Sequence, residues 1–267
     1  MPVQPKRTWS YSANLSFLFP EVPFLERFAA ARTAGFEAVE YVCMFDHPPD
    51  ELADAARSAG VETILINIPH GRWAQGERGI AIFPDRQDEF RASLADTIRY
   101  CEALGCRRVN CLAGLAPPSA DRAALRSTLV ANLRYASSAL ADAGISLVIE
   151  PINATDMPGF FLNTADDAAS VLREAGSGNL AIQFDVYHEQ AMTGAAIEAL
   201  ERHFADISHV QIADAPGRNE PGTGNIDFAN LFATLDRLGY RGHVGLEYRP
   251  KAGTVEGLSW MGTLGVV

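Results

Sequence analysis

The stretch SLVIEP, residues 146–151, is an apolar run that ends abruptly in an acidic residue, Glu150. Burying an acidic side chain at the end of a strand costs free energy unless another group pairs with it. Three later apolar runs end in the same way: LAIQFD at Asp185, ISHVQ at Gln211 and HVGLE at Glu247. The intervals between these four residues are 35, 26 and 36 positions, each close to a strand–helix unit of roughly 30 residues. In a closed parallel barrel the carboxyl ends of the strands meet on one rim, which would bring the four side chains together.

Segments with strand and helix character alternate along the whole chain. Several helical segments end at a glycine that precedes an apolar or β-branched run, as at Gly60 and Gly105. This alternation is typical of an α/β protein with a parallel sheet. We expect eight strands, at residues 11–16, 38–42, 61–67, 107–112, 146–150, 180–185, 206–213 and 242–247. We expect helices at residues 23–35, 50–60, 86–104, 121–143, 164–175, 189–205 and 227–238, and a short final helix after Thr254.

The lengths of the connections favour a (β/α)8 TIM barrel. The segments that follow the third, fifth and seventh strands are long, whereas the turns from helix to strand are short. Long loops on one rim and tight turns on the other are typical of a barrel whose site lies at the carboxyl ends of its strands. A barrel of this kind commonly takes about 250 residues, so we expect residues 1–267 to form one domain. An open, doubly wound sheet is the alternative fold.

The alternation of side chains within the strands indicates which residues face the barrel axis. If Asp185 points inward, so do Gln183 and Ala181, while Ile182 and Phe184 point toward the helices. The same rule pairs Glu150 with Val148, Gln211 with His209, and Glu247 with Gly245 and His243. The outward set is large and apolar and the inward set is small or polar. The four rim residues therefore belong to the face on which a site can form.

The residue types at the rim predict a metal-dependent enzyme. Three carboxylates and one amide oxygen are hard donors that suit Mg²⁺ or Mn²⁺, with Co²⁺ as a further option. Carboxylates placed this close would repel each other unless a cation neutralises them. A divalent ion would bind two adjacent oxygens of an α-hydroxycarbonyl compound or an α-keto acid and stabilise the enediolate formed from it. Glu150 and Glu247, on different strands, are the candidates for general base and general acid.

Other residues near the rim are candidates for substrate contacts. His188 follows Asp185 by three positions, and Arg218 stands in the long loop after the seventh strand. An anionic substrate would make Arg218 a carboxylate clamp. Weaker candidates for the same role are His70, Arg72, Arg249 and Lys251. We expect His209 and His243 to be structural residues deeper in the barrel.

Composition limits the partners. The formal net charge of −11 argues against nucleic acid or an anionic membrane as the main partner. The partner that we expect from the metal site and from the family resemblance given below is a small anionic acid. No stretch approaches the roughly 20 apolar residues of a membrane span, and the polar start MPVQPKRTWS is unlike a signal peptide, so we expect a cytoplasmic protein. The four cysteines, Cys43, Cys101, Cys106 and Cys111, lack zinc or CxxC spacing and are expected to be reduced and buried. The composition is compatible with a monomer or a homo-oligomer.

Seven motifs together closely resemble the hydroxypyruvate isomerase family, which belongs to the xylose isomerase-like TIM barrels: YSANLSFLF, GRWAQGERGIAIFPDRQDEF, LVIEPIN, QFDVYH, HVQIAD, GRNEPGTGNIDF and GLEYRP. The resemblance extends from about Tyr11 to Trp260. It implies reversible interconversion of hydroxypyruvate and tartronate semialdehyde. It also implies that Glu150 and Glu247 form the catalytic pair and that Glu150, Asp185, Gln211 and Glu247 hold the metal. His188 and Arg218 match positions that contact substrate in related sugar epimerases and isomerases.

Two positions depart from the family pattern. Asn225 replaces the glutamate of the usual PGTGEI motif, and Arg72 replaces the aspartate of the usual GDW motif. Both changes could alter substrate preference without altering the metal ligands. Isomerisation of 2-oxo-tetronate, a longer acid, uses the same chemistry and is the main alternative, together with related sugar isomerases and epimerases. A non-catalytic acid-binding barrel and a metal-dependent AP endonuclease are the more distant alternatives.

Overall fold

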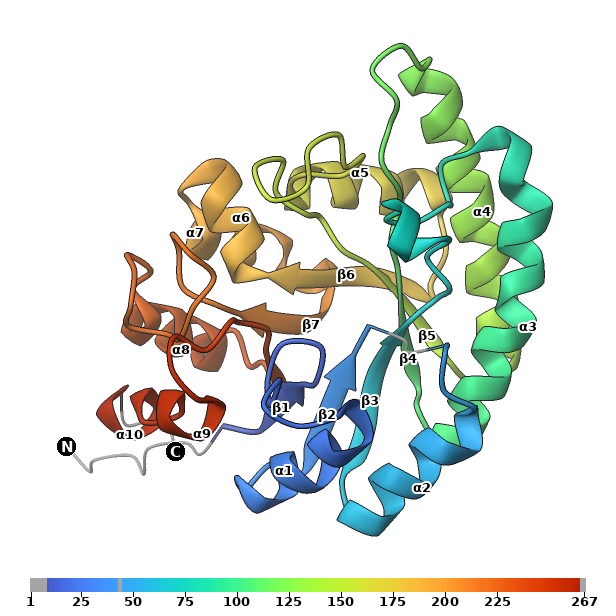
Figure 1. The fold of residues 1–267 in the computed structure, drawn as a ribbon. Helices are drawn as coiled ribbons and strands as arrows, with labels where there is room; N and C mark the ends of the chain where they lie inside the picture. Colours follow the sequence, from blue (N-terminus) through green and yellow to red (C-terminus); the bar gives the residue numbers. More distant parts are fainter. Residues whose placement is uncertain (1–8, 43–44, 265–267) are drawn as a thin grey trace.

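Eight parallel strands close into a barrel in chain order, so that β1 pairs with both β2 and β8. This computed structural model describes residues 9–42 and 45–264 (Figure 1). The register between the first and last strands places Tyr11 opposite Val244. The strands are β1 (Tyr11–Asn14), β2 (Ala38–Tyr41), β3 (Glu62–Asn67), β4 (Arg108–Cys111), β5 (Ser146–Ile149), β6 (Leu180–Asp185), β7 (Ile207–Ile212) and β8 (Val244–Leu246). The predicted (β/α)8 barrel is confirmed, and the open sheet is excluded because the barrel is closed.

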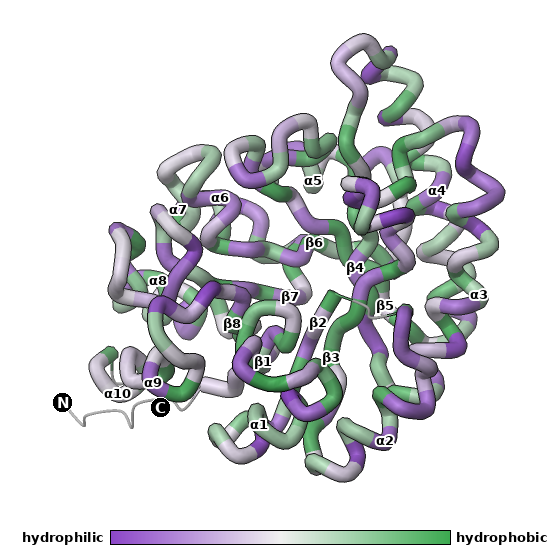
Figure 2. Tube along the Cα trace, in the orientation of Figure 1, coloured by the Kyte–Doolittle hydropathy of each residue, from purple (hydrophilic) through white to green (hydrophobic). Residues whose placement is uncertain are grey.

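Helices between the strands form an outer ring around the barrel (Figure 1). In Figure 2 the outer helices α3 and α4 carry alternating hydrophobic and hydrophilic residues, as expected for helices with one face against a barrel. The α-helices are α1 (Arg27–Thr33), α2 (Pro49–Ala59), α3 (Gln87–Leu104), α4 (Arg122–Asp142), α5 (Ala165–Ala175), α6 (Val186–Thr193), α7 (Ala196–His203), α8 (Phe228–Arg237), α9 (Thr254–Gly257) and α10 (Trp260–Leu264). Short 3₁₀ turns are η1 (Phe24–Glu26), η2 (Trp73–Gln75), η3 (Pro84–Arg86) and η4 (Phe204–Asp206).

The single helix predicted over residues 189–205 is wrong. The structure has two helices here, α6 and α7, followed by the turn η4. The first of them begins directly after β6, because the side chain of Asp185 caps it by accepting the N–H of Tyr187 at 2.9 Å. It ends at Gly194, whose φ of 70° is a left-handed conformation that glycine adopts without strain. One consequence is that His188 lies on a helix instead of in a loop.

The barrel wall separates two apolar clusters. The smaller cluster, inside the barrel, contains Val148 with Ala38, Ile64 and Leu65, and Ala181 packs against it. The larger cluster contains the outward residues of the strands, among them Ile182 and Phe184, and the inner faces of the helices. The predicted alternation of inward and outward side chains is therefore confirmed. Burial of the apolar side chains in these clusters is the main stabilising contribution to the fold.

The longest connections from strand to helix follow β3, β5 and β7, as predicted, and span residues 68–86, 150–164 and 213–227. All three belong to the carboxyl ends of the strands, where the candidate site lies. Three of the four cysteines, Cys101, Cys106 and Cys111, are buried, as expected, and Cys43 lies outside the described residues. Among the helices that the structure describes, none has both the length and the apolar character needed to cross a membrane.

Candidate active site

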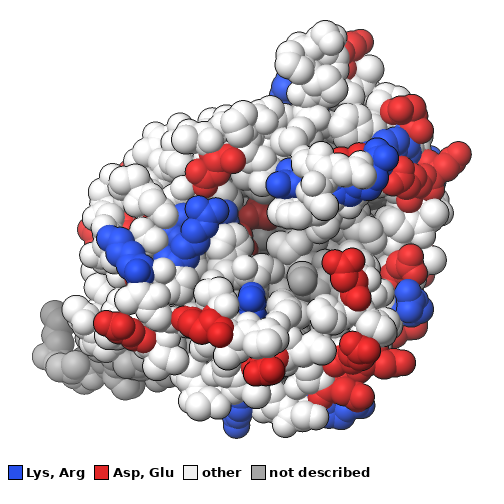
Figure 3. Space-filling model, viewed as in Figure 1, with Lys and Arg blue, Asp and Glu red and all other residues white. Residues whose placement is uncertain are grey.

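A cavity of about 1080 Å³ opens at the carboxyl ends of the strands. Figure 3 shows a hollow at the centre of this face, with acidic side chains deep inside it and basic side chains on both sides of the rim. Its floor includes Glu150, Gln211 and Glu247. The loop after β3 contributes one wall, with His70, Trp73 and Arg78 among its lining residues. The structure thus places the rim residues of β5, β7 and β8 around one enclosed space.

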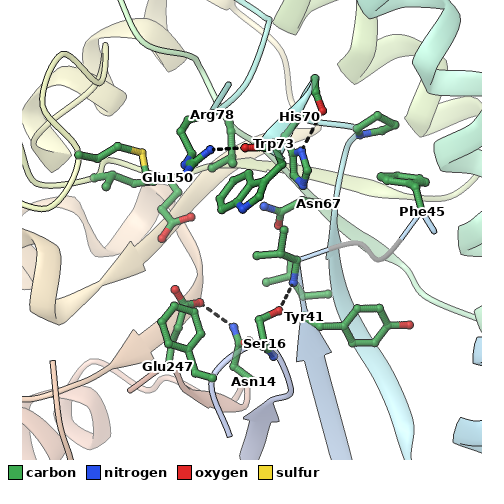
Figure 4. Close-up of a pocket in the computed structure, with 18 of the residues that line it drawn as sticks. Asn14, Ser16, Tyr41, Phe45, Asn67, His70, Trp73, Arg78, Glu150 and Glu247 are labelled. Atoms are coloured by element: carbon green, nitrogen blue, oxygen red, sulfur yellow. Dashed lines mark hydrogen bonds between the residues drawn. The ribbon is translucent and has the colours of Figure 1, made fainter. Parts of the chain in front are cut away.

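Three buried carboxylates lie at the base of this cavity. Glu150 follows β5, Asp185 ends β6 and Glu247 follows β8, and their exposed fractions are 5%, 2% and 8%. In Figure 4 the carboxyl groups of Glu150 and Glu247 face each other from opposite sides of the space. Asp185 is fully covered and lies beneath Arg218. The sequence-based expectation that these strand ends converge agrees with this placement.

Burial and mutual repulsion make these carboxyl groups hard to ionise. Burial, together with the charges of Glu247 and Asp185, raises the pKa of Glu150 well above its usual range. Burial raises the pKa of Glu247 to about 8, against the opposing attraction of Arg218. Burial also raises the pKa of Asp185. A carboxyl group with a pKa of about 8, as in Glu247, exchanges protons near neutral pH, which is the property that general acid–base catalysis needs.

Arg218 is the cation that pairs with this cluster. Its Nη2 atom lies 3.3 Å from Asp185 Oδ2 and also donates a short hydrogen bond to Glu247 Oε1. Burial favours the neutral guanidinium, but attraction to Glu247, Asp185 and Glu150 outweighs that effect and raises the pKa of Arg218. The guanidinium lies over the rings of Phe17, at 4.6 Å, and Tyr187, at 5.3 Å. Its backbone φ of 55° is unusual for a residue other than glycine, and such strain is concentrated at functional sites.

Asn153 determines which nitrogen of His188 carries the proton. The Asn153 side-chain oxygen accepts the backbone N–H groups of Thr155, at 3.1 Å, and Asp156, at 2.8 Å. The orientation of the amide is therefore set, and its NH₂ group must be the one that lies 2.7 Å from His188 Nδ1. Burial lowers the pKa of His188 well below its usual range, so the ring is neutral, accepts at Nδ1 and donates from Nε2–H. His188 Nε2 lies 3.6 Å from Asp185 Oδ2.

A group of side chains here could hold a metal ion. Ligand atoms of Glu150, Asp185 and His188 all lie within 4.8 Å of one another. Within the described part of the chain, these three buried carboxylates face one buried guanidinium, that of Arg218, so the site has a deficit of positive charge that a divalent cation would correct. Carboxylate oxygens are also the donors that such hard cations prefer. His188 suits this set less well than the carboxylates, because its Nε2 carries a proton and its Nδ1 is occupied by Asn153.

Gln211 occupies the floor between two carboxylates. Its NH₂ group donates to Glu247 Oε2 at 2.6 Å and to Glu40 Oε1 at 2.7 Å. Its carbonyl oxygen accepts from Gln183 at 2.7 Å. In this arrangement Gln211 acts as a hydrogen-bond donor to Glu247, and its oxygen faces Gln183.

Sequence reasoning missed Glu40 and Asn153. Glu40 is completely buried inside the barrel and accepts hydrogen bonds from Ser12 and His209 as well as from Gln211. Burial opposes its ionisation, but the charge of His209 and these hydrogen bonds outweigh burial and lower the pKa of Glu40. One signal was visible in the sequence: Glu40 is an acidic residue in the middle of the apolar strand AVEYV. His209 lies deep in the barrel, as predicted.

The remaining predicted residues lie farther from the base. His70 is half-buried and lines the outer cavity, where its ring packs 4.6 Å from that of Trp73. Arg72 is exposed, lines the outer cavity and is paired with Glu77 at 2.8 Å, and Glu77 also pairs with Arg86 at 2.9 Å. Lys251 is exposed, and its backbone N–H binds Glu220 at 2.9 Å. Neither Lys251 nor Asn225 is among the described residues that line the cavity. The structure therefore does not bring these two residues to the site.

Comparison with known proteins relates this fold and site to isomerases. Residues 28–264 match the family model described as Xylose isomerase-like TIM barrel. The chain is 44% identical over 251 residues to the 2-oxo-tetronate isomerase of Cupriavidus necator, covering 94% of this chain and 96% of the relative. It is 45% identical over 251 residues to the hydroxypyruvate isomerase of Escherichia coli K12, covering 94% and 97%. The crystal structure of AP endonuclease, family 2, from Brucella melitensis superimposes with a TM-score of 0.93 at 39% identity, covering 96% of this chain and 99% of that one.

Proposed function

Because this chain belongs to the xylose isomerase-like TIM barrel family, we propose that it interconverts hydroxypyruvate and tartronate semialdehyde, also called 2-hydroxy-3-oxopropanoate. The chain is an isomerase of this superfamily, as its relatives at 44% and 45% identity are. The observation that carries the proposal is the pair Glu150 and Glu247, which face each other across the cavity with raised pKa values. Two such groups can remove a proton from one carbon of a substrate and return one to its neighbour.

The two glutamates have complementary tasks in this proposal. One carboxylate removes a proton from the hydroxymethyl carbon of hydroxypyruvate, and the electron pair moves into an enediolate. The other carboxyl group delivers a proton to the adjacent carbon, and a hydroxyl proton is redistributed to yield the aldehyde. The starting acid and the product are isomers, so no atom is gained or lost. Glu150 and Glu247 both line the cavity, so either can take the role of base.

The cofactor we propose is a divalent metal ion, Mg²⁺ or Mn²⁺ in preference to Co²⁺. Glu150, Asp185 and Glu247 would hold it, whereas Gln211, the fourth ligand predicted from the sequence, would position Glu247 through its NH₂ group. Bound there, the ion would supply positive charge that stabilises the enediolate. His188 is then a substrate contact, because its Nε2–H is a donor directed into the cluster.

Cationic side chains around the cavity suit an anionic substrate. Arg218 lies at the base, and Arg78 and Arg249 line the walls. Half-buried His70 lies farther out and can contribute a hydrogen bond, since burial lowers the pKa of its ring and disfavours its charge. A short hydroxy-keto acid can therefore place its reacting carbons between the glutamates and its carboxylate near a guanidinium. Lys251 is not retained as a contact because it is exposed and lies away from the lining.

Isomerisation of 2-oxo-tetronate is the second candidate, favoured by the 44% identical relative from Cupriavidus necator. The cavity of about 1080 Å³ accommodates either acid. Steady-state kinetics with the two acids side by side, after chelation and add-back of Mg²⁺ or Mn²⁺, separates the candidates. If kcat/KM is more than tenfold higher for 2-oxo-tetronate than for hydroxypyruvate, 2-oxo-tetronate replaces hydroxypyruvate as the proposed substrate.

Deuterium exchange tests the chemistry itself. Wild-type protein incubated with hydroxypyruvate and Mg²⁺ or Mn²⁺ in D₂O should yield tartronate semialdehyde and incorporate deuterium at carbon. The nearly isosteric variant Glu247→Gln should fold normally, as measured by circular dichroism, and lose turnover by at least about 100-fold, because general acid–base groups contribute 10² to 10⁴ in rate. A wild type that yields neither product nor deuterated substrate would favour a non-catalytic acid-binding barrel. Turnover of Glu247→Gln within tenfold of wild type would contradict its assignment as an acid–base group.

We do not propose endonuclease activity for this chain, although the structure from Brucella melitensis is named AP endonuclease. The net charge of −11 and the acidic base of the cavity would repel a phosphodiester backbone. The buried carboxylates instead suit a small acid that meets cationic side chains at the cavity wall. The isomerase relatives agree with this choice.

A further inference from the structure

We propose that Glu40 is a positioning residue for the isomerase reaction: its carboxylate, enclosed below the floor of the cavity, orients Gln211 and Asn14 so that both hold Glu247 in place. The inference rests on the proposed function for the role of Glu247. Glu40 itself does not line the cavity among the described residues. It would therefore act through its neighbours and not on the substrate.

The contacts form a continuous path from Glu40 to Glu247. Glu40 Oε1 accepts from Gln211 Nε2 at 2.7 Å, and the same nitrogen donates to Glu247 Oε2 at 2.6 Å. Asn14 Nδ2 bridges the same two carboxylates, at 3.5 Å from Glu40 Oε1 and 2.7 Å from Glu247 Oε2. Two amide NH₂ groups are thus held between the two acidic side chains, and Glu247 Oε2 receives both of them.

The charge of Glu40 determines which way the Gln211 amide points. A carboxylate only accepts hydrogen bonds, so the group that faces it must be the NH₂ and not the oxygen. Ser12 and His209 occupy Glu40 Oε2, at 2.7 and 2.9 Å, and hold the carboxylate in place from the other side. A neutral amide at position 40 could donate as well as accept, and Gln211 would lose its unique orientation.

The barrel is built to accommodate this carboxylate. The pairing of β2 with β3 shifts register between Val39 and Glu40, and irregularities of this kind redirect side chains next to active sites. On β8, a Cβ atom added to Gly245 would lie 2.5 Å from Glu40 Oε1 and 2.8 Å from the Cγ of Gln211. Glycine is therefore required at position 245 to leave room for both side chains.

Two variants disturb the same contact in different ways. Glu40→Gln removes the charge and keeps the size, whereas Gly245→Ala keeps the charge and pushes the Glu40 carboxylate and the Gln211 side chain out of place. Glu37→Gln is the matched control, because this side chain is 85% exposed and lies three positions earlier in the same segment. Each protein is assayed for kcat and KM with hydroxypyruvate and Mn²⁺, for Mn²⁺ affinity by calorimetry, and for thermal unfolding.

We expect Glu40→Gln and Gly245→Ala each to lower kcat and to weaken Mn²⁺ binding by about 10- to 100-fold, the usual effect of removing a group that orients a metal ligand. KM should stay within about threefold of wild type, and Glu37→Gln should match wild type throughout. The double variant should be no worse than the more impaired single variant, because both changes remove one interaction. If one variant fails to fold, the other decides.

Several outcomes would overturn the inference. One is that the variants that fold keep both kcat and Mn²⁺ affinity within threefold of wild type. Glu40 would then have a purely structural role, even if the melting temperature of these variants falls. Another is a change confined to KM. If wild-type protein does not isomerise hydroxypyruvate, the proposed function fails. The inference is then judged on Mn²⁺ affinity alone, where weakened binding in both variants supports it and unchanged binding overturns it.

Discussion

Asp185 has two tasks that its two oxygens divide between them. One oxygen, Oδ1, accepts the N–H of Tyr187 and caps α6. The other, Oδ2, lies 3.3 Å from Arg218 and 3.6 Å from His188, inside the candidate metal cluster. The residue therefore couples the start of a helix to the chemistry of the site. Any substitution at this position has to be interpreted for both tasks.

Two substitutions of Asp185 separate these tasks. Asp185→Asn retains an acceptor for the helix cap but loses the charge, whereas Asp185→Ala loses both. We expect both variants to bind Mn²⁺ at least about tenfold more weakly by calorimetry. In denaturant unfolding, Asp185→Ala should be about 1 kcal/mol less stable than Asp185→Asn, because an N-cap is worth roughly that much. Unchanged Mn²⁺ affinity in Asp185→Asn would remove Asp185 from the ligand set.

Among the elements, the loop after β3 decides the shape of the outer cavity. Arg78 lies over the ring of Trp73 at 3.7 Å and binds its carbonyl oxygen at 3.1 Å, and Figure 4 shows both side chains on the wall opposite Glu247. The loop rests on the segment after β4 at Gly79, where an added Cβ would lie 2.2 Å from the carbonyl oxygen of Leu112. This close approach holds the wall against the barrel.

Two glycines of this loop make a matched pair for a test. Both Gly76 and Gly79 have a left-handed φ, of 92° and 109°, so alanine is strained at either position, but only at Gly79 does a Cβ collide with backbone. We expect Gly79→Ala to raise the KM for hydroxypyruvate about tenfold relative to Gly76→Ala, because displacing a positioning wall by an ångström has a large effect on substrate alignment. Steady-state kinetics of the two variants is the measurement. Equal KM values would show that the contact with Leu112 does not position the wall.

At the scale of the whole molecule, the barrel concentrates negative charge where water cannot screen it. Glu150, Asp185 and Glu247 are buried at its base with Arg218 as their cationic partner. The raised pKa of Glu247, about 8 against an ordinary 4.5, means that the folded protein binds a proton there more tightly than the unfolded chain does. The stability that this group contributes is therefore fully present below pH 4.5 and is lost as pH rises toward 8.

A comparison of wild type with Glu247→Gln across pH tests this effect, because only wild type has a titratable group at position 247. We expect the free energy of unfolding of Glu247→Gln, relative to wild type without added metal, to increase between pH 5 and pH 9, by about 1.4 kcal/mol for each unit of pKa difference. Denaturant unfolding at several pH values is the measurement. A difference that stays flat or falls with pH would contradict the raised pKa.

A bound divalent metal ion should counteract the loss of stability at high pH. Metal ions and protons compete for the carboxylates, so saturating Mn²⁺ should raise the melting temperature of wild type more at pH 8 than at pH 5.5. Thermal unfolding with and without Mn²⁺ at the two pH values measures this, with Asp185→Asn as the control that should respond less. An equal or larger rise at pH 5.5 would mean that the ion binds elsewhere.

The amino-acid sequence by itself determined the barrel, the order of its strands and the convergence of Glu150, Asp185, Gln211 and Glu247. These features depend on local periodicity and on strand ends, because parallel strands that close in order must bring their carboxyl ends to one rim. The prediction placed the start of α6 too late, at residue 189. Asp185, the last residue of β6, caps α6 directly, so no loop separates the strand from the helix.

Only the tertiary structure decided the hydrogen bonds that orient these residues. Glu40 and Gln211 are 171 positions apart, and their contact depends on the register shift in β2 and on the space left by Gly245. The tautomer of His188 depends likewise on how Asn153 is turned by the backbone of its own loop. Hydrogen bonds are short and directional, so a shift of about an ångström breaks them. Hydrophobic packing tolerates a shift of this size. The hydrophobic pattern of the sequence therefore predicts the fold but not how the side chains of the site are oriented.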